Sequence, residues 1–340
     1  MKAIQIRKPN DLRVIDMEKP VTDEKNNVLV KIKAAGICGS DVGIYHGTNA
    51  VASYPRVIGH EMVGEVVELR SGTGKLKPGD RVIIDQVINC GHCYACRHNR
   101  GNVCQNLQVR GVHVDGGYRE YMAVPEKDCY LLPECLSYED AVMIEPTTIA
   151  IQFCSRAELT AEDTLLIYGV GVLGSSILRI ARLSGAKIIV TDLVEEKLQR
   201  ALQNGADFAI NGAKENLGER LKEITEDGYG PTVSVDAACT KNSLATLLDV
   251  TGNAGRVITM GFSNAPTEVT QMKITTKELD VRGSRLQNKK FQEAIDLIEQ
   301  GKLDLNGAVS HRFKFTDAQK AFDFVDTKDP SIRKIVLTFD

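Results

Sequence analysis

One segment of the chain constrains its fold more than any other. A continuous apolar run, Thr164–Tyr168, leads directly into the sequence Gly-Val-Gly-Val-Leu-Gly at residues 169–174. An uninterrupted apolar run is typical of a strand buried on both faces of a parallel sheet. A helical pattern then extends to about Ser184, and a second apolar strand at residues 187–191 is followed by Asp192. This order of strand, glycine turn, helix, strand and acid predicts a dinucleotide-binding unit.

Each glycine of this turn has its own physical task in such a unit. Gly169 makes the tight turn, Gly171 lets the backbone approach a pyrophosphate, and Gly174 allows the helix to pack closely on the strand. The helix begins at about Val172 and Leu173, and its first N–H groups favour an anionic ligand. A glycine turn in an α/β sheet without any ligand is the alternative interpretation.

Asp192 indicates which cofactor to expect. Its carboxylate can accept hydrogen bonds from both ribose hydroxyls of the adenosine half and would repel a 2′-phosphate, so the sequence favours NAD over NADP. Lys197, on the following helix, is a further candidate for contact with the cofactor.

The rest of the chain shows two kinds of pattern. Up to about residue 150, short β-type runs separated by Gly, Pro and Asp indicate an antiparallel or barrel-like domain. Strands are expected there at residues 1–7, 27–34, 64–69 and 81–85. From about residue 160, strands alternate with helices, which indicates a doubly wound parallel sheet. Its further strands are expected at residues 208–211, 232–237, 256–260 and 278–283.

The last residues are expected to return to the first domain, with a helix at Phe291–Glu299 and a final strand at 334–339. The fold class is therefore α/β with two domains. The predicted domains are residues 1–148 with 288–340, and residues 149–287.

A second strong local pattern is a group of four cysteines within fifteen residues: Cys90, Cys93, Cys96 and Cys104. Four soft ligands without an open position suit one tetrahedral, structural zinc. The alternatives are an iron–sulfur cluster, which usually takes a different spacing and a following proline, or an accidental group of surface cysteines. The spacing favours zinc, which would stabilise a lobe and perform no chemistry.

Three further segments, far apart in the sequence, contain residues that can bind a metal: Cys-Gly-Ser-Asp at residues 38–41, Gly-His-Glu at 59–61, and Glu-Pro at 145–146. Together with the four-cysteine lobe and the glycine-rich domain, in this order, they resemble the zinc-dependent medium-chain alcohol dehydrogenases over the whole chain. The resemblance implies a GroES-like β-rich catalytic domain and a Rossmann domain. It also implies NAD and two zinc ions per chain, one structural and one catalytic.

In that family, a catalytic zinc with one open position is held by residues that match Cys38 and His60, with a third ligand near position 145. Ethanol-type enzymes usually have cysteine there, whereas Glu145 resembles the sorbitol and polyol branch. In that branch the residue matching Glu61 also lies beside the metal, as an exchangeable ligand or just behind the ligands. The residue matching Asp41 orients the histidine.

The resemblance also implies the chemistry. The zinc lowers the pKa of the substrate alcohol, Ser40 passes its proton outward, and the carbon-bound hydrogen leaves as hydride to the nicotinamide. Many relatives carry a histidine five residues after the first zinc ligand, but Gly43 stands there in this chain. His46 is nearby in sequence and need not replace it, so we expect water or Glu61 to carry the proton further.

Residues 54–61, 111–117 and 284–286 resemble a bacterial subgroup that contains the starvation-sensing zinc dehydrogenase and the L-gulonate and L-galactonate 5-dehydrogenases. These enzymes oxidise a secondary alcohol of a hexonate. The resemblance implies a polyhydroxy substrate, with L-gulonate oxidised at C5 to D-fructuronate as the preferred candidate. Arg285 and His113 are candidates for substrate contact, and a loop-bracing role for both is an equal alternative.

Other functions stay open. A neutral-polyol dehydrogenase of the sorbitol or L-iditol type, or an L-galactonate 5-dehydrogenase, would share zinc and NAD. A non-enzymatic NAD-binding regulator and a zinc-free quinone reductase are disfavoured because Cys38, His60, Glu61 and Glu145 are all retained.

Composition excludes further classes. With 42 basic and 45 acidic residues and a net charge of -3, the chain offers no bulk support for nucleic-acid binding. No apolar run approaches the length of a membrane span, and the charged N-terminus does not resemble a signal peptide. We therefore expect a cytoplasmic protein in which the nine cysteines are thiols or zinc ligands. Relatives are dimers or tetramers, so the resemblance implies a homo-oligomer, with a tetramer, as in the polyol branch, preferred over a dimer.

Overall fold

The structure, a computed structural model, describes residues 1–72, 74–262 and 264–339 and divides into two compact units. One unit is Met1–Glu145 with Phe291–Asp340, and the other is Pro146–Lys290. The boundaries predicted from sequence lie three residues from these at each junction (148 against 145, and 288 against 291).

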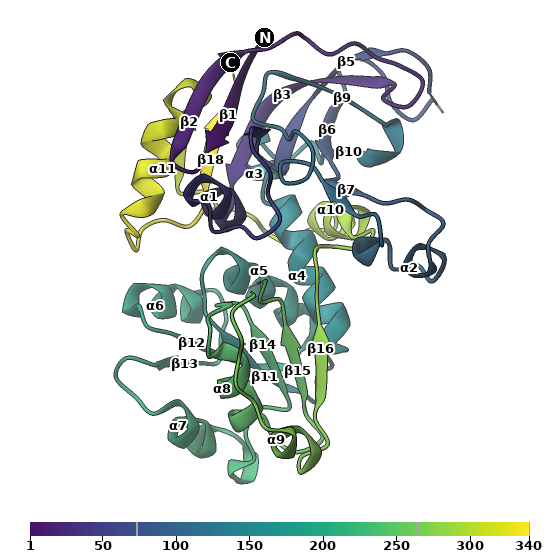
Figure 1. The fold of residues 1–340 in the computed structure, drawn as a ribbon. Helices are drawn as coiled ribbons and strands as arrows, with labels where there is room; N and C mark the ends of the chain where they lie inside the picture. The colour runs from purple at the N-terminus through teal and green to yellow at the C-terminus, as the bar shows by residue number, and fades with distance from the viewer. Residues whose placement is uncertain (73, 263, 340) are drawn as a thin grey trace. The chain divides into compact units, whose positions relative to one another are not determined.

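The first unit is built mainly from strands (Figure 1). Its strands are β1 (Lys2–Lys8), β2 (Asp11–Asp16), β3 (Val28–Ile37), β4 (Arg56–Val57), β5 (Glu61–Leu69), β6 (Arg81–Ile84), β7 (Val87–Ile88), β8 (Gln108–Val109), β9 (Tyr121–Val124), β10 (Cys129–Leu131), β17 (His311–Lys314) and β18 (Ile335–Thr338). Its helices are α1 (Gly39–His46), α2 (Tyr94–Arg97), α3 (Tyr138–Ala141), α10 (Phe291–Glu299) and α11 (Ala318–Asp326). The main sheet has the order β10-β6-β5-β3-β18-β17 with β9 also paired to β3, and smaller sheets have the orders β2-β1-β4 and β7-β8.

The central strand β3 organises this unit. It pairs antiparallel with β5 on one side and with β18, the last strand of the chain, on the other. The sequence predicts that this strand ends at residue 34, but it continues to Ile37. Residues 34–36 are Ala-Ala-Gly, which have low β-propensity by themselves. They are held in the sheet because both neighbouring strands pair with them.

Within its described residues, the second unit has the strands β11 (Thr164–Tyr168), β12 (Lys187–Asp192), β13 (Phe208–Asn211), β14 (Val233–Asp236), β15 (Arg256–Thr259) and β16 (Asp280–Gly283). Its helices are α4 (Ile144–Ala157), whose first two residues belong to the other unit, α5 (Val172–Ala181), α6 (Glu195–Gln203), α7 (Leu217–Ile224), α8 (Ser243–Val250) and α9 (Gln271–Thr275). All strand pairs are parallel, in the order β13-β12-β11-β14-β15-β16.

This strand order reverses direction between β11 and β14, and ligands of such sheets bind at the carboxyl ends of the strands beside the reversal. The glycine turn follows β11 and therefore lies at this place. An apolar core packs the sheet against α7 and α8; it includes Leu166, Ile189, Leu221, Leu247 and Val257.

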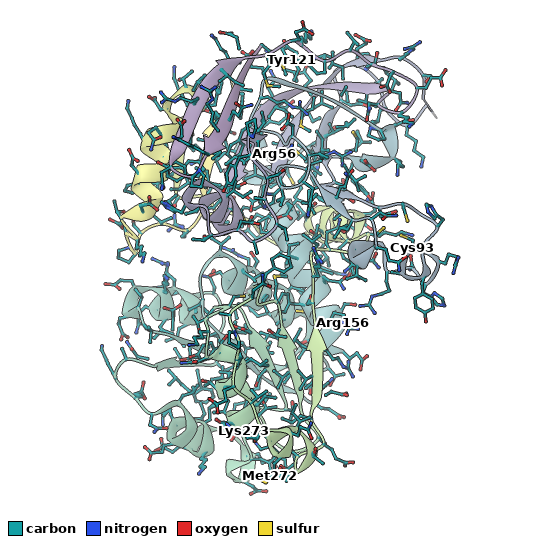
Figure 2. All side chains as sticks on the ribbon, in the orientation of Figure 1. Arg56, Cys93, Tyr121, Arg156, Met272 and Lys273 are labelled. Carbon is teal, nitrogen blue, oxygen red and sulfur yellow. The ribbon has the colours of Figure 1, made fainter. Side chains whose placement is uncertain are left out.

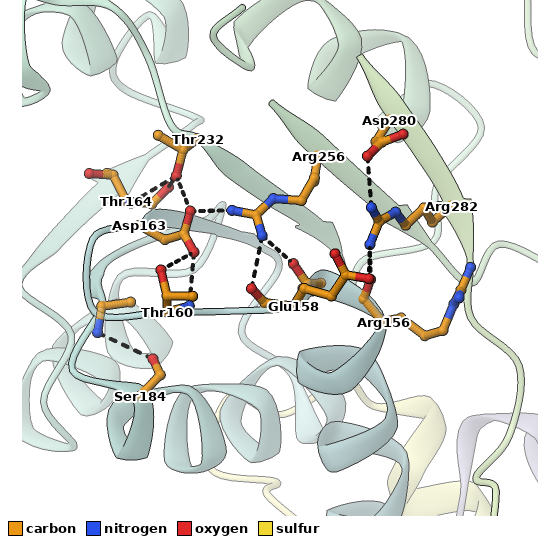
Figure 3. Close-up of polar contacts among 12 residues, drawn as sticks. Arg156, Glu158, Thr160, Asp163, Thr164, Ser184, Thr232, Arg256, Asp280 and Arg282 are labelled. Carbon is orange, nitrogen blue, oxygen red and sulfur yellow. Dashed lines mark hydrogen bonds and ion pairs between the residues drawn. The ribbon is translucent and has the colours of Figure 1, made fainter. Parts of the chain in front are cut away.

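A polar network joins the segments at the amino ends of the strands, opposite the glycine turn (Figure 3). Asp163, just before β11, accepts hydrogen bonds from the Thr160 backbone N–H at 2.8 Å, from Thr232 Oγ1 at 2.8 Å, and from the Arg256 guanidinium. Arg256 also donates to the carbonyls of Ala157 and Glu158, both at 2.8 Å. The network ties the end of α4 to the starts of β11, β14 and β15, so it fixes the strand that carries the glycine turn.

No helix in the described residues is both long and apolar enough to cross a membrane.

Candidate metal centre and cofactor turn

Three of the predicted metal ligands meet at one point in the first unit. One ligand atom from each of Cys38, His60 and Glu61 lies within 4.8 Å of the others. Cys38 is the residue between β3 and α1, and His60 directly precedes β5. Since β3 and β5 pair antiparallel with Gly36 opposite Glu61, the end of one strand and the start of the other bring these side chains together.

Asp41, on the first turn of α1, holds the histidine from behind. Its Oδ1 lies 3.5 Å from His60 Nδ1 and accepts the Gly59 backbone N–H at 3.2 Å. Its Oδ2 accepts the Cys38 backbone N–H at 2.9 Å. With Nδ1 turned toward the carboxylate, His60 Nε2 is the nitrogen available to a metal, and Ser40 Oγ lies 3.4 Å from it.

Tyr118 is a neighbour of this site that the sequence analysis missed. Its side chain is fully buried, and its hydroxyl lies 2.9 Å from the Gly36 carbonyl oxygen and 3.3 Å from Asp41 Oδ2. Burial, together with the charge of Asp41, raises the pKa of Tyr118 well above its ordinary value. The hydroxyl therefore keeps its proton and acts as a donor.

Lys334 is the second residue that the sequence analysis missed. Its ammonium group lies 2.6 Å from each carboxylate oxygen of Glu61 and donates to the Ile37 carbonyl at 3.2 Å. Both side chains are 1% exposed. Gly36 makes room for the pair, because a Cβ at that position would lie 1.9 Å from Glu61 Oε2.

The predicted third ligand, Glu145, is buried at the start of α4. Its Oε1 accepts a hydrogen bond from Gln86 Nε2 at 2.5 Å, and it lies outside the three-residue group. Burial raises the pKa of Glu145 to about 8; His60 lowers it, and Glu61 raises it further. Glu145 is therefore a buried carboxyl whose protonation responds to the charges of His60 and Glu61.

The electrostatics of the site favour a bound cation. Burial by itself lowers the pKa of His60, yet the charges of Asp41 and Cys38 raise it well above its ordinary value. A positive charge is therefore stabilised between these groups, whether a proton or a metal ion carries it. A thiolate, an imidazole and carboxylates form the mixed donor set that zinc accepts, so the residues present fit a zinc ion.

The four-cysteine lobe forms a separate group in the same unit. Cys90, Cys93, Cys96 and Cys104 each offer a sulfur within 4.8 Å of the others, and Figure 2 shows Cys93 on the lobe that carries α2. The Cys104 sulfur accepts backbone N–H groups of Cys90 and Asn106, both at 3.3 Å. Backbone N–H donors from Gln105 and Cys96 lower the pKa of Cys93 to about 6, whereas burial and the bond with Cys93 raise the pKa of Cys96 to about 12. Four sulfurs close enough to share one ion are the donor set of a structural zinc, so this group also fits the metal.

The glycine turn of the second unit has the shape of a phosphate cradle. Gly169 has φ +96° and packs against Ala238, while a Cβ on Gly174 would lie 1.9 Å from the Gly169 carbonyl oxygen. In contrast, a Cβ on Gly171 would meet nothing within 4 Å. Gly169 and Gly174 are therefore needed for packing, and Gly171 borders open space where Val172 and Leu173 begin α5.

Asp192 ends β12, beside the same turn. Its Oδ2 accepts the Val170 backbone N–H at 2.9 Å, and its Oδ1 accepts the N–H groups of Leu193 and Val194 at 2.8 and 3.1 Å. These bonds join the acid to the glycine turn. Lys197 lies on the first part of α6, which starts three residues after Asp192.

The two candidate substrate residues have local contacts of their own. In the first unit, His113 Nδ1 accepts the Val109 backbone N–H at 3.1 Å. In the second unit, the Arg285 guanidinium lies over the Phe262 ring, 5.0 Å from its centroid. His46, considered for the proton path, contacts Asn10 at 3.0 Å and Asp326 at 2.9 Å on the surface. Its partners therefore lie outside the metal group.

Two family models match the chain. Residues 24–134 match the alcohol dehydrogenase GroES-like domain, and residues 172–300 match the zinc-binding dehydrogenase domain. The first match contains the Cys38, His60 and Glu61 group together with the four-cysteine lobe.

Known proteins resemble the chain over its full length. It is 41% identical over 341 residues to the starvation-sensing protein RspB of Escherichia coli strain K12, covering 100% of this chain and 99% of the relative. A crystal structure of rspB from Escherichia coli CFT073, complexed with the cofactor NADH, has a TM-score of 0.94 at 41% identity and covers 100% of this chain and 99% of that one. L-idonate 5-dehydrogenase from Escherichia coli has a TM-score of 0.88 at 28% identity, covering 99% and 98%.

The buried ion pair generates a prediction about stability. Lys334→Met leaves Glu61 charged and unpaired beside other negative groups, so we expect a loss of about 3 kcal/mol in the free energy of unfolding. Adding Glu61→Gln should restore much of that loss, because the double variant has no uncompensated charge. Urea unfolding followed by circular dichroism measures both effects.

The matched control for this prediction is Lys2→Met, which removes an exposed pair with Asp16 and should leave the urea midpoint nearly unchanged. A Lys334→Met variant as stable as the wild type would contradict the account of the site.

Proposed function

The chain belongs to the zinc-dependent medium-chain alcohol dehydrogenases, and from this membership we propose that it oxidises a secondary alcohol of a hexonate and passes the hydride to NAD. It is an oxidoreductase that uses zinc and a nicotinamide cofactor, of the kind that acts on polyols and sugar alcohols. The observation that carries the proposal is the convergence of Cys38, His60 and Glu61 in the domain that precedes a dinucleotide-binding fold.

In the proposed site, Cys38, His60 and Glu145 hold the catalytic zinc, and the four cysteines hold a structural one. When bound, the catalytic zinc supplies Lewis acidity that lowers the pKa of a substrate hydroxyl. Ser40 Oγ, 3.4 Å from His60 Nε2, would accept the proton that this hydroxyl loses and release its own proton outward to water. Glu61 is paired with Lys334 through both carboxylate oxygens, and it would have to leave that pair to exchange onto the metal or to carry a proton.

The proposed cofactor site is the glycine turn. Gly169, Gly171 and Gly174 shape the backbone around the pyrophosphate, and the α5 N–H groups that begin at Val172 and Leu173 face it. Asp192 binds the adenosine ribose, with Lys197 nearby. The nicotinamide accepts the hydride.

We expect a strong preference for NAD over NADP. Asp192 places a negative charge where a 2′-phosphate has to bind. The ratio of kcat/KM for NAD to that for NADP should fall by roughly tenfold or more in Asp192→Ala, equivalent to about 1.4 kcal/mol. Glu223→Ala, which removes an exposed acid on α7, should leave the ratio unchanged. A wild-type enzyme that uses both cofactors equally would rule out this role for Asp192.

The proposed substrate is a sugar acid, with L-gulonate oxidised at C5 to D-fructuronate as the preferred case. The alternatives are L-galactonate and a neutral polyol of the sorbitol or L-iditol type. Similarity to L-idonate 5-dehydrogenase, which is named for a hexonate, supports an acid. Arg285 is the proposed partner of the substrate carboxylate, and its stacking on Phe262 would hold its planar group in place. His113 is a further candidate for substrate contact.

A substrate comparison tests this proposal. If Arg285 binds the carboxylate, kcat/KM for the best hexonate should exceed that for the matching hexitol. Arg285→Ala should lower only the value for the acid, by roughly 10- to 100-fold, as expected for loss of a charged hydrogen bond. Arg282→Ala, at a neighbouring arginine paired with Glu158 and Asp280, should not change the ratio of acid to hexitol. Faster turnover of sorbitol or L-iditol than of any hexonate would favour the neutral-polyol alternative.

We also propose that the chain forms a homo-oligomer, a tetramer or a dimer, in the cytoplasm. In the described residues β16 is the last strand of its sheet, and Val281 on this strand and Met272 on α9 are 40% and 69% exposed. An exposed strand edge with apolar side chains is suited to pairing with a second copy.

A further inference from the structure

We propose that Tyr118 is a positioning residue of the catalytic zinc site, which holds Asp41 and through it both Cys38 and His60. The inference rests on the proposed function, since it assigns Tyr118 to the ligands of that zinc.

The hydroxyl of Tyr118 contacts both β3 and α1, the two elements on either side of Cys38. It lies 2.9 Å from the Gly36 carbonyl at the end of β3 and 3.3 Å from Asp41 Oδ2 on α1. A phenol has one hydrogen to donate, so these acceptors share it. The hydroxyl thereby fixes Asp41 against the strand that leads into Cys38.

The Asp41 carboxylate passes this restraint on to both ligands. Its Oδ2 accepts the Cys38 backbone N–H at 2.9 Å, and its Oδ1 faces His60 Nδ1 at 3.5 Å. If the phenolic donor is lost, Oδ2 keeps the Cys38 N–H, and the carboxylate is less restrained against rotation. Because Oδ1 orients the imidazole, His60 then loses part of its fixed direction toward the metal.

The ring of Tyr118 contacts the backbone beside His60. Gly59 has φ +94°, and a Cβ there would lie 2.1 Å from Tyr118 Cδ1. The ring therefore packs directly on the residue before His60. Phenylalanine would keep this contact and remove only the hydroxyl, so the two contributions can be separated.

Burial makes the hydroxyl difficult to replace. Tyr118 and Asp41 are both fully buried, and solvent does not reach the Asp41 oxygen that the hydroxyl contacts. Without the phenolic donor, Asp41 Oδ2 keeps only the Cys38 N–H and no water replaces the missing bond, so part of the desolvation cost of the carboxylate is left uncompensated. The loss should appear in how tightly the site holds its metal.

Zinc release tests the proposal in the full-length protein. Tyr118→Phe should release one of its two zinc ions to a chelator roughly tenfold faster than the wild type, as is usual for loss of a group behind a metal ligand. Release of the second zinc, from the four-cysteine lobe, should be unchanged and serves as an internal reference. With cobalt in the catalytic site, the visible absorption bands of Tyr118→Phe should shift, which a general loss of stability does not produce.

Two further variants make the test specific. Tyr54→Phe removes a similar bond, from the Tyr54 hydroxyl to the Ile44 carbonyl at 2.5 Å, and should leave zinc release and the cobalt spectrum unchanged. In an Asp41→Asn background, Tyr118→Phe should add little, because its effect passes through Asp41.

The outcomes separate the two proposals. If wild-type protein holds two zinc ions but Tyr118→Phe matches it in zinc release and cobalt spectrum, the inference is wrong and the proposed function stands. If wild-type protein holds zinc only in the four-cysteine lobe, both are wrong.

Discussion

The buried ion pair between Glu61 and Lys334 is the interaction on which the metal centre depends. Three groups that can be negative belong to the first unit: Glu61 and Glu145, which are buried, and Cys38, which is half-buried. Such a concentration of charge is stable only if cations compensate it. Lys334 supplies one from the last part of the chain, and its pKa, which burial lowers, is raised overall by Glu61 and Cys38. A zinc ion would supply the rest.

The two units prepare their ligand sites by different physical means. In the first, charge and hydrogen bonds arrange the donors, and Gly36 serves by leaving space for an ion pair. In the second, steric exclusion does most of the work, because close contacts require glycine at Gly169 and Gly174, while Gly171 leaves its side open. Catalysis of this type needs both: donors that fix a metal, and a backbone surface that fixes a dinucleotide.

Features encoded by local sequence were predictable. The α/β fold class is confirmed, and β11 and β13 occupy the predicted residues. The four cysteines gather as their spacing implied. Features encoded by distant pairs were not predictable from one sequence. Lys334 precedes an apolar strand and reads as an ordinary lysine at a strand end, yet its partner Glu61 is 273 residues away. Tyr118 reads as an aromatic core residue, because nothing local marks the Asp41 that it contacts.

Zinc content per chain tests the central claim most directly, measured on the purified wild type and on Cys38→Ser and Cys93→Ser. The account predicts two zinc ions in the wild type. Cys38→Ser should hold one zinc, keep its fold and lose catalysis, whereas Cys93→Ser should lose the lobe zinc and stability. A Cys38→Ser protein that retains two zinc ions and full activity would contradict the account, because the catalytic metal would then lie elsewhere.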